Sequence, residues 1–429
     1  IYLRRNFEHF ESMKKLFWHL RLLIVRKRFR EIRWSFITLK LSDYFGLAKW
    51  ILFRMIGLSR DDQVVKFETK ISQVLGVENV VSFSGGRVAL RAILQAMNVG
   101  PGDEVIVPGY TCVVVPYAVI HLGAKPVYVD VGDDYLIDIE ELKAAINNNT
   151  KVIVTQHTYG YQDRVDEIIS IARTRGIRVI EDSAHAIGKW PDGSAPGLNS
   201  DAAFFSFENS KPLTSFWGGA VATNNPEIAD SVNQIKKQTP THSLLAEILI
   251  ANHVLLASIL YHPNIVGLGR YIFAILLRLG ILNHSISESD EKGFEPKTPI
   301  RRLSNPQAYL LLRQIDRMGE IESRRRKAVN AYSELFGLEN PDIPLLRFPI
   351  LTSDKQKLVV QFAKQQIELG QWFQAPLHPE SSDFDAAGYR WGSCPNAENI
   401  AKLCINLPTS ISGSDLDHVL KLAERYIKV

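Results

Sequence analysis

A lysine follows shortly after an apolar run that ends near a serine. Lys211 lies five residues after Ser206, and the run Ala202–Phe207 has the composition of a buried strand. A lysine held away from water and near other positive charge binds its proton less tightly, and its neutral amine can then form a Schiff base with a carbonyl compound. Most lysines in loops are only solvated, so the chemical hypothesis for Lys211 depends on the residues around it.

Two carboxylates and a histidine follow another apolar run. The pair Val179–Ile180 leads into Glu181 and Asp182, and His185 lies three residues beyond Asp182. One carboxylate here could hold a protonated ring nitrogen of a cofactor and keep the ring electron-withdrawing, while the imidazole hydrogen-bonds a phenolic oxygen. The structural alternative is an aspartate that caps a helix and a histidine on the surface. This stretch alone leaves both interpretations open.

A glycine pair separates a third apolar run from a helical pattern. Gly85 and Gly86 follow Val80–Phe83, Arg87 comes next, and the helical pattern begins at about Val88. Glycines let backbone N–H groups approach an anion, and a helix N-terminus adds positive potential. The stretch is therefore a plausible phosphate cradle, and an ordinary strand-to-helix turn is the alternative.

Short β-branched runs alternate with amphipathic stretches from residue 62 to about residue 235. The expected strands are Val80–Phe83, Glu104–Val107, Pro126–Val131, Lys151–Gln156, Arg178–Glu181, Ala202–Phe207 and Ala220–Thr223. Such alternation predicts a mostly parallel sheet covered by helices, hence an α/β fold. Ligands of these sheets bind at the carboxyl ends of strands, where loops meet helix N-termini.

The sequence predicts an extension and two domains. A chain of 429 residues is too long for one ordinary core. We expect a basic extension over residues 1–60, a large domain over 61–294 with an apolar insertion at about 241–290, and a small α/β domain over 295–429. In the small domain the sequence predicts helices at Pro306–Met318, Glu320–Phe336 and Leu416–Ile427.

The extension is strongly basic and also apolar. Residues 1–60 hold 14 Lys and Arg against 4 Asp and Glu, in a chain whose total charge is +4. Leu16, Leu20 and Leu23 recur at helical spacing, and residues 14–58 as a whole have the composition of a basic amphipathic helix in a bilayer interface. A helical extension packed on the body or on a partner subunit is the alternative. Nucleic acid is not expected, because no binding motif accompanies the charge.

The insertion contains apolar runs that polar residues interrupt. The runs are Leu244–Ile250, Val254–Leu260 and Tyr271–Leu277. None approaches the roughly 20 residues that span a bilayer. They predict a helical hairpin that packs on a dimer partner or dips into one leaflet, and both interpretations stay open.

Cysteine usage indicates a reducing compartment. Cys112, Cys394 and Cys404 are too few and too scattered for a disulfide framework, and none belongs to a CxxC pair. We therefore expect no metal site and a cytoplasmic location, at the inner face of the cell membrane if the extension binds lipid.

In order and spacing, these motifs resemble the DegT/DnrJ/EryC1/StrS family of sugar aminotransferases, which depend on pyridoxal phosphate (PLP) and have the aspartate aminotransferase (type I) fold. The resemblance covers residues 62–240 closely and 295–429 more loosely. It is carried by Gly100–Val105, Gly123–Val127, His157–Gly160, Glu181–His185, Ser206–Lys211, Gly218–Gly219, Asn305–Ala308 and Asn406–Thr409.

The resemblance implies a role for three residues at the cofactor ring. Lys211 matches the lysine that carries PLP as a Schiff base. Asp182 matches the carboxylate on the pyridine nitrogen, and His185 stands where the family has Gln or His facing the phenolic oxygen. Transamination in this family is ping-pong, with an amino acid, here expected to be glutamate, as donor and a keto-sugar as acceptor.

The phosphate site follows the family pattern with one departure. Ser206 matches the phosphate-binding hydroxyl, and Gly86 and Arg87 fall on the phosphate-binding turn. The family usually has Thr where Arg87 stands, and a guanidinium can bind phosphate through two N–H groups.

A second departure concerns the aromatic residue that stacks on the cofactor ring. In the family it follows a Thr, whereas Thr111 is followed by Cys112. Either Cys112 covers the ring, or Tyr110 or Tyr117 takes this place.

The expected product is an amino-sugar for a surface polysaccharide or glycolipid, made on a nucleotide-linked or lipid-linked keto-sugar. The resemblance also implies a homodimer whose sites are built partly from the other subunit. The sequence leaves two other functions to consider. A PLP-dependent dehydratase of the same fold generally has His in place of Lys211, which argues against it. A catalytically inactive scaffold or regulator at the membrane surface stays open because of Arg87 and Cys112.

Overall fold

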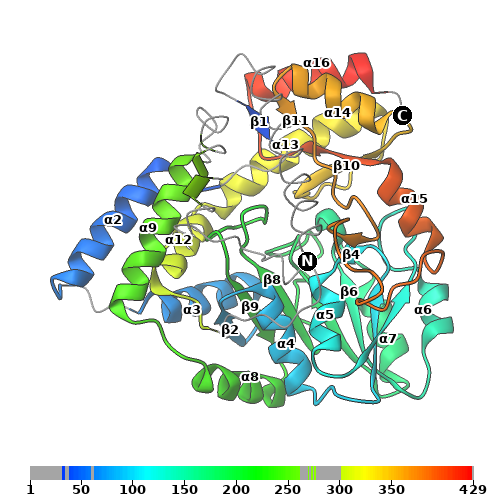
Figure 1. The fold of residues 1–429 in the computed structure, drawn as a ribbon, viewed down its shortest axis with the longest axis horizontal. Helices are drawn as coiled ribbons and strands as arrows, with labels where there is room; N and C mark the ends of the chain where they lie inside the picture. The colour runs from blue at the N-terminus through cyan, green and yellow to red at the C-terminus, as the bar shows by residue number, and fades with distance from the viewer. Residues whose placement is uncertain are drawn as a thin grey trace, which may run out of the picture.

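The computed structural model describes the chain in several stretches. They are residues 31–33, 38–58, 62–260, 269, 272–273, 275–276 and 301–427. These residues form an α/β protein in which the C-terminal elements gather beyond one edge of a large central sheet (Figure 1).

The central sheet has seven strands in the order β2-β9-β8-β7-β6-β3-β5. Their bounds are Asn79–Phe83 (β2), Glu104–Pro108 (β3), Lys125–Val129 (β5), Thr150–Gln156 (β6), Arg178–Asp182 (β7), Ala202–Ser206 (β8) and Gly219–Thr223 (β9). Strands β5, β3, β6, β7 and β8 run parallel, and β9 is antiparallel to both β8 and β2. The mostly parallel sheet expected from the sequence is confirmed, and every expected strand overlaps an observed one.

Two strands end earlier than expected, β8 at Ser206 and β5 at Val129. The predicted strand Pro126–Val131 stops at Val129, because the carboxylate of Asp130 redirects the chain. This carboxylate accepts hydrogen bonds from the backbone N–H groups of Val131 and Asn396, each at 2.8 Å.

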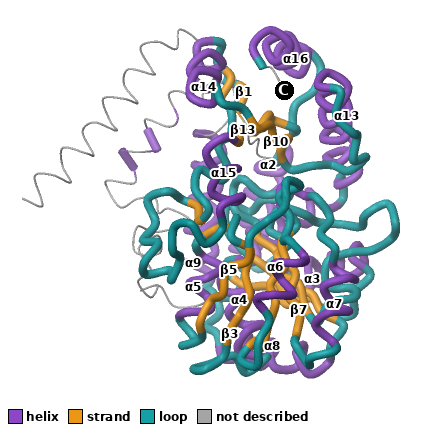
Figure 2. The backbone as a smooth tube through the Cα atoms, turned by 90° about the vertical axis from the view of Figure 1, so that its right-hand side faces the viewer, coloured by secondary structure: helices purple, strands orange, loops and turns teal. Residues whose placement is uncertain are grey.

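Helices cover both faces of the sheet. One face carries α4 (Gly86–Ala96), α5 (Val114–Ile120) and α8 (Pro226–Gln238). The other carries α3 (Gln63–Leu75), α6 (Ile139–Ala145), α7 (Val165–Arg173) and α12 (Asn305–Ile315). Figure 2 shows the strands enclosed between these layers. A sheet covered on both faces buries nearly every strand residue, which explains the continuous apolar runs in the sequence.

The small domain consists of helices around a short antiparallel pair. The helices are α13 (Met318–Phe336), α14 (Lys355–Lys364), α15 (Pro395–Leu403) and α16 (Ser414–Tyr426), and the pair is β10 (Arg347–Leu351) with β13 (Cys404–Pro408). The helix predicted over Pro306–Met318 is shorter than expected, because α12 ends at Ile315 and α13 begins at Met318. Strand β12 (Leu377–His378) pairs with β4 (Thr111–Cys112) and so links the small domain to the large one.

The described part of the basic extension contains a strand as well as a helix. Strand β1 (Ile32–Arg33) pairs in parallel with β11 (Ile367–Glu368) of the small domain. Arg33 Nε also lies 3.0 Å from a carboxylate oxygen of Glu368. The expectation of a helix was therefore wrong at Ile32–Arg33, because pairing with an available strand overrides the local helical pattern.

Two apolar helices pack side by side on α12. They are α2 (Leu41–Met55) and α9 (Leu244–Leu260), which share a buried cluster that includes Leu47 and Val254 (Figure 1). The first two apolar runs of the predicted hairpin therefore form one continuous helix, α9. Leu16, Leu20 and Leu23, and most of residues 261–300, lie outside the described residues. Among the described helices, none is long and apolar enough to cross a membrane.

Candidate active site

Three strands end at the same edge of the sheet and bring the predicted residues together. Because β9 is antiparallel to both of its neighbours, β2 runs in the same direction as β7 and β8. Asp182 is the last residue of β7, Ser206 is the last residue of β8, and Gly86 follows β2. The sequence therefore assembles these side chains by the ordinary geometry of a parallel sheet.

The turn between β2 and α4 requires glycine. A Cβ atom at Gly86 would lie 3.0 Å from Ser206 Cβ, and a Cβ at Gly219 would clash with the carbonyl group of Gly85. These close approaches bring the first turn of α4 against the end of β8. Arg87, in that first turn, is half-buried. The start of α4 therefore lies against Ser206, and Arg87 is the second residue of that helix, an arrangement that suits a phosphate group.

The two carboxylates at the end of β7 have separate environments. Glu181 lies 2.9 Å from His157 Nε2, accepts a hydrogen bond from the backbone N–H of Gly197 at 2.8 Å, and also accepts one from the Ser200 hydroxyl at 2.5 Å. These contacts make Glu181 part of the buried framework. Asp182 is therefore the carboxylate of this pair that faces the site.

Asp182 is buried beside Lys211. Its Oδ1 accepts a hydrogen bond from the backbone N–H of Ala184 at 2.9 Å. Burial raises the pKa of Asp182 to about 6, although the Ala184 N–H and the charges of Lys211 and His157 act in the opposite direction. A cation placed against this carboxylate would favour its ionised form, which is what a protonated pyridine nitrogen would supply.

Lys211 is half-buried at the end of a tight turn. Its N–H donates to the carbonyl oxygen of Glu208 at 3.1 Å, and its Nζ lies 4.5 Å from the centre of the Trp372 ring. Burial lowers the pKa of Lys211, and the charge of Arg347 lowers it further, whereas Glu208 raises it. A lowered pKa increases the fraction of neutral amine, which is the form that makes a Schiff base.

His185 is buried and accepts a hydrogen bond. The backbone N–H of Tyr159 donates to His185 Nδ1 at 3.1 Å. Burial holds the pKa of His185 well below its usual value, with further lowering by Lys211 and Arg347. A neutral imidazole whose Nδ1 accepts carries its proton on Nε2, so His185 can donate a hydrogen bond to a phenolate oxygen.

Cys112 is the residue of its strand that borders the reactive groups. Burial raises the pKa of its thiol, and the charges of Lys211, Asp182 and Arg87 all act on it. Tyr110, by contrast, lies with its hydroxyl 2.7 Å from that of Tyr159 and accepts a hydrogen bond from the Phe373 N–H.

Tyr117, the other aromatic alternative, also points to a different partner. Its ring stacks on His121 with the ring centres 6.2 Å apart, and its hydroxyl donates to the carbonyl oxygen of Asp383 at 3.2 Å. The structure therefore favours Cys112 as the neighbour of a cofactor ring.

Comparisons with known proteins identify the family of the chain. A family model described as the DegT/DnrJ/EryC1/StrS aminotransferase family matches residues 53–246 and 280–423. The chain belongs to this family. It is therefore an aminotransferase with PLP as its cofactor, as the sequence motifs predicted.

Two relatives illustrate the likeness. The UDP-2-acetamido-2-deoxy-3-oxo-D-glucuronate aminotransferase of Pseudomonas aeruginosa is 31% identical to the chain over 331 residues, which are 74% of this chain and 86% of that protein. The GDP-perosamine synthase of Caulobacter vibrioides is 36% identical over 176 residues, which are 41% of this chain and 47% of that protein.

Solved structures confirm the fold. A DegT DnrJ EryC1 StrS aminotransferase from Brucella abortus superposes with a TM-score of 0.68 at 24% identity, covering 90% of this chain and 95% of that one. NtdA from Bacillus subtilis with bound PMP superposes with a TM-score of 0.67 at 19% identity, covering 90% of this chain and 82% of that one.

Sequence reasoning missed two residues of this aminotransferase site. The guanidinium carbon of Arg347 lies 3.5 Å from the centre of the Trp372 ring, which also faces Lys211. Trp372 Nε1 donates to His378 Nε2 at 2.5 Å. Both missed residues belong to the small domain, where the resemblance is looser, and neither lies near Lys211 in the sequence.

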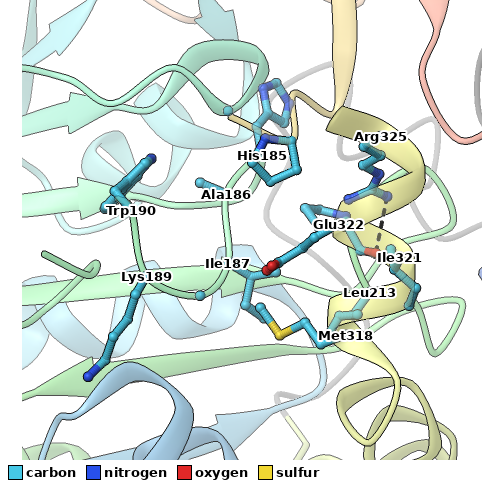
Figure 3. A pocket seen from close by; sticks show the side chains of 14 residues that line it. His185, Ala186, Ile187, Lys189, Trp190, Leu213, Met318, Ile321, Glu322 and Arg325 are labelled. Carbon is cyan, nitrogen blue, oxygen red and sulfur yellow. Dashed lines mark hydrogen bonds between the residues drawn. The ribbon is translucent and has the colours of Figure 1, made fainter. Parts of the chain in front are cut away.

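Helix α13 of the aminotransferase contacts the loop that contains Lys211. Arg325 donates from its terminal nitrogen to the carbonyl oxygen of Pro212 at 3.2 Å, and from Nε to the Ser410 hydroxyl at 3.3 Å. A pocket separates this helix from the segment that begins at His185, and Glu322 points into it (Figure 3). The residue after Lys211 is thus tied to the small domain.

Among the described residues, no group of three or more His, Cys, Asp and Glu side chains could hold a metal ion.

Proposed function

We propose that this aminotransferase moves an amino group from glutamate to a nucleotide-linked keto-sugar, for the biosynthesis of a surface polysaccharide. The observation that carries the proposal is the convergence of Lys211, Asp182 and His185 at one sheet edge, with the pKa of the lysine lowered. The names of the relatives support an acceptor of this class, since they include a UDP-oxo-glucuronate aminotransferase and GDP-perosamine synthases.

The ring of PLP would be held by three of these residues. The buried Asp182 carboxylate would pair with the protonated pyridine nitrogen, and His185 would donate to the phenolic oxygen from Nε2. Cys112 would lie against the ring, among the charges of Lys211 and Asp182. The residues present fit the cofactor.

The phosphate of PLP would lie at the start of α4. Ser206 would donate its hydroxyl, Arg87 its guanidinium, and the turn at Gly86 its backbone N–H groups. Arg87 in place of the usual Thr would bind the phosphate through charge as well as hydrogen bonding.

Lys211 would carry out the proton transfer. When bound, PLP withdraws electrons from the substrate carbon that exchanges a proton. The Lys211 amine, with its lowered pKa, would take that proton and return it at the neighbouring position, acting as base and then as acid. Asp182 would stay ionised and keep the ring nitrogen protonated. These features also support an active enzyme over an inactive scaffold.

A visible absorption spectrum tests the proposal. The purified protein with PLP is expected to show a Schiff-base band that borohydride removes, and Lys211→Ala is expected to lack that band. Wild-type protein should then convert a nucleotide-linked keto-sugar with glutamate, whereas Lys211→Ala should not. Full turnover by Lys211→Ala would refute the assignment.

We also propose that the enzyme is a homodimer that attaches to anionic membrane surfaces through α2 and α9. The α2–α9 face consists of exposed apolar side chains on these two helices and at the residue that follows α2. Its members are Leu41, Phe45, Leu52, Ile56, Leu245, Leu249 and Ile259.

The chemistry of this face supports a lipid partner. Phe45 is 69% exposed and Leu249 is 60% exposed, so the apolar surface is substantial. Lys49 is exposed on the same stripe of α2, and the chain around it carries the excess of 14 basic over 4 acidic residues in residues 1–60. Exposed apolar groups combined with positive charge are typical of proteins that lie on anionic bilayers.

Vesicle sedimentation tests the attachment. The full chain is expected to bind phosphatidylglycerol-containing vesicles at low salt and phosphatidylcholine vesicles far less, and the double change Phe45→Asp and Leu249→Asp should abolish binding. Val360→Asp is the matched control, because Val360 is 53% exposed on α14, away from this face. Unchanged vesicle binding by the double variant, or loss of the dimer instead, would contradict the lipid proposal.

A further inference from the structure

The segment that follows Lys211 is held by a buried glutamine of α12. Gln314 is fully buried, and its Oε1 accepts a hydrogen bond from the backbone N–H of Thr214 at 3.0 Å. Its Nε2 donates to the carbonyl oxygen of Thr214 at 2.7 Å and to that of Leu310 at 2.9 Å. The side chain thus binds both backbone groups of a residue that lies three positions after Lys211.

The described part of the extension completes the hydrogen bonding of this glutamine. The hydroxyl of Thr38 donates to Gln314 Oε1, which therefore accepts two hydrogen bonds while Nε2 donates two. A primary amide has two acceptor sites on its oxygen and two donors on its nitrogen, so all four sites of Gln314 have partners. Exchanging the oxygen and the nitrogen would set N–H groups against the Thr214 N–H. The amide therefore has one preferred orientation, and the extension contributes to it.

A buried ion pair fixes Thr38 beside this glutamine. Asp43, in the first turn of α2, is fully buried and accepts a hydrogen bond from Arg317 Nη1 at 2.9 Å. Arg317 lies between α12 and α13, and its Nη2 also donates to the Thr38 carbonyl oxygen at 2.9 Å. The backbone N–H of Lys40 donates to Asp43 at 2.7 Å and closes the turn. These contacts hold the Thr38 hydroxyl at Gln314.

An apolar contact joins α2 to the same segment. Phe216, five residues after Lys211, is buried in a cluster with Leu47 of α2 and Leu310 of α12. Its φ is 71°, a left-handed conformation that costs energy for an aromatic residue and persists only where the surroundings enforce it. Its N–H donates to Thr214 Oγ1 at 3.0 Å. The extension therefore holds this segment through a polar contact and an apolar one.

We propose that the extension is a positioning element for Lys211. Thr38 acts through Gln314 and Thr214. The inference rests on the proposed function, in which the Lys211 amine moves a proton between two neighbouring atoms. Such a transfer depends steeply on the distance between the donor and the acceptor. Because the Thr214 end of the Lys211 loop is fixed by Gln314, a looser Thr214 would widen the range of positions that the amine occupies.

Hydrogen exchange tests the contact in PLP-free protein. Thr38→Val removes the hydroxyl and keeps the shape of the side chain, and Thr38→Ser restores the hydroxyl. We expect the Thr214 amide to exchange roughly 5-fold faster in Thr38→Val, the equivalent of one ordinary hydrogen bond, and to return toward the wild-type rate in Thr38→Ser. Strand β6 is the internal reference, and an equal rise there would contradict a local effect.

Lys40→Met is the matched control for both measurements. It removes an ion pair of 2.7 Å with Glu320 of α13, two residues after Thr38 in the same segment. Both partners of this pair are exposed, so it contributes little to stability. Lys40→Met should therefore leave the exchange of Thr214 and the reaction rate at their wild-type values.

Single-turnover kinetics of the PLP-loaded enzyme test the consequence. The half-reaction with glutamate is followed by loss of the Schiff-base band, and its rate is expressed per loaded site. Thr38→Val is expected to lower the limiting rate on the order of 10-fold, because the amine is less well placed. The half-saturating glutamate concentration should not change, since no substrate-binding group is altered. The isotope effect with α-deuterated glutamate should be at least as large as in wild type, because proton transfer is the step that is slowed.

The outcomes separate this proposal from the one on which it rests. A wild type without a Schiff-base band, or without reaction with glutamate, would refute the proposed function. Wild-type exchange at Thr214 in Thr38→Val would overturn the positioning proposal. Faster exchange with an unchanged rate per loaded site would also overturn it, because the contact would then be structural only. If Thr38→Val does not fold, Leu47→Val, which trims the apolar contact with Phe216, is judged by the same two results.

Discussion

Replacing Asp182 by Asn should stabilise the cofactor-free protein while it weakens the enzyme. Burial raises the pKa of Asp182 from 3.8 to about 6, which means that the fold disfavours the charged form. Below pH 3.8 the carboxyl group is protonated in both folded and unfolded protein and does not reduce the unfolding free energy. As pH rises from 3.8 through about 6, the unfolding free energy falls, because the folded protein resists ionisation of Asp182. Asn has no charge to bury and removes this pH dependence.

The magnitude follows from the two pKa values. A shift of roughly 2 pKa units corresponds to about 3 kcal/mol at pH 8, where Asp182 is ionised in both folded and unfolded protein. At pH 5 only about half of this loss of unfolding free energy has occurred. Wild type should thus lose about 1.4 kcal/mol of unfolding free energy relative to Asp182→Asn between pH 5 and pH 8.

Chemical denaturation of PLP-free protein at the two pH values measures this difference. The same Asn variant should bind PLP more weakly and turn over more slowly, because the pyridine nitrogen loses its anionic partner. An identical pH dependence of the unfolding free energy in wild type and variant would contradict a raised pKa of Asp182 in the folded protein. Stabilisation together with full activity would refute its role at the ring nitrogen.

Three further changes test other parts of the site. Gly86→Ala places a Cβ 3.0 Å from Ser206 Cβ and should weaken PLP binding at the phosphate, which a fluorescence titration with PLP would show; unchanged affinity would contradict the cradle. Arg87→Thr restores the residue usual in the family and should retain the Schiff-base band but release PLP more readily on dialysis at low salt, with a smaller difference at high salt, which screens the charge of Arg87; equal retention at low salt would remove the charge argument. Glu181→Gln leaves one oxygen acceptor for the contacts that the carboxylate makes with His157, Gly197 and Ser200, and should lower the unfolding free energy by about 1–3 kcal/mol, measured by urea denaturation; a change near zero would contradict its framework role.

Residues at the ends of strands of the central sheet were predictable, because a parallel sheet has simple geometry. Each strand forms from one continuous apolar run, and its carboxyl end is marked by the next polar or glycine residue. The order of these runs is therefore enough to assign Asp182, Ser206 and Gly86 to a common edge. The approach of Lys211 to Asp182 was expected from the same geometry and from the family resemblance.

Residues brought together by domain packing were not predictable. Arg347 begins a short strand and Trp372 lies in a loop, and nothing in the local sequence links either one to Lys211. The prediction at Ile32 and Arg33 was wrong for a related reason, since these residues form strand β1 only by pairing with β11. The local pattern alone does not distinguish Glu181 from Asp182. The family resemblance selects Asp182, and the contact of Glu181 with His157 agrees with that choice.

The central claim is that Lys211 carries the cofactor. The most direct measurement is peptide mapping by mass spectrometry after borohydride reduction of the PLP-loaded protein. A reduced pyridoxyl group is expected on the peptide that contains Lys211, and the corresponding peptide of Lys211→Ala should lack it. A label on a different lysine, or no label on a protein that still transaminates, would contradict it.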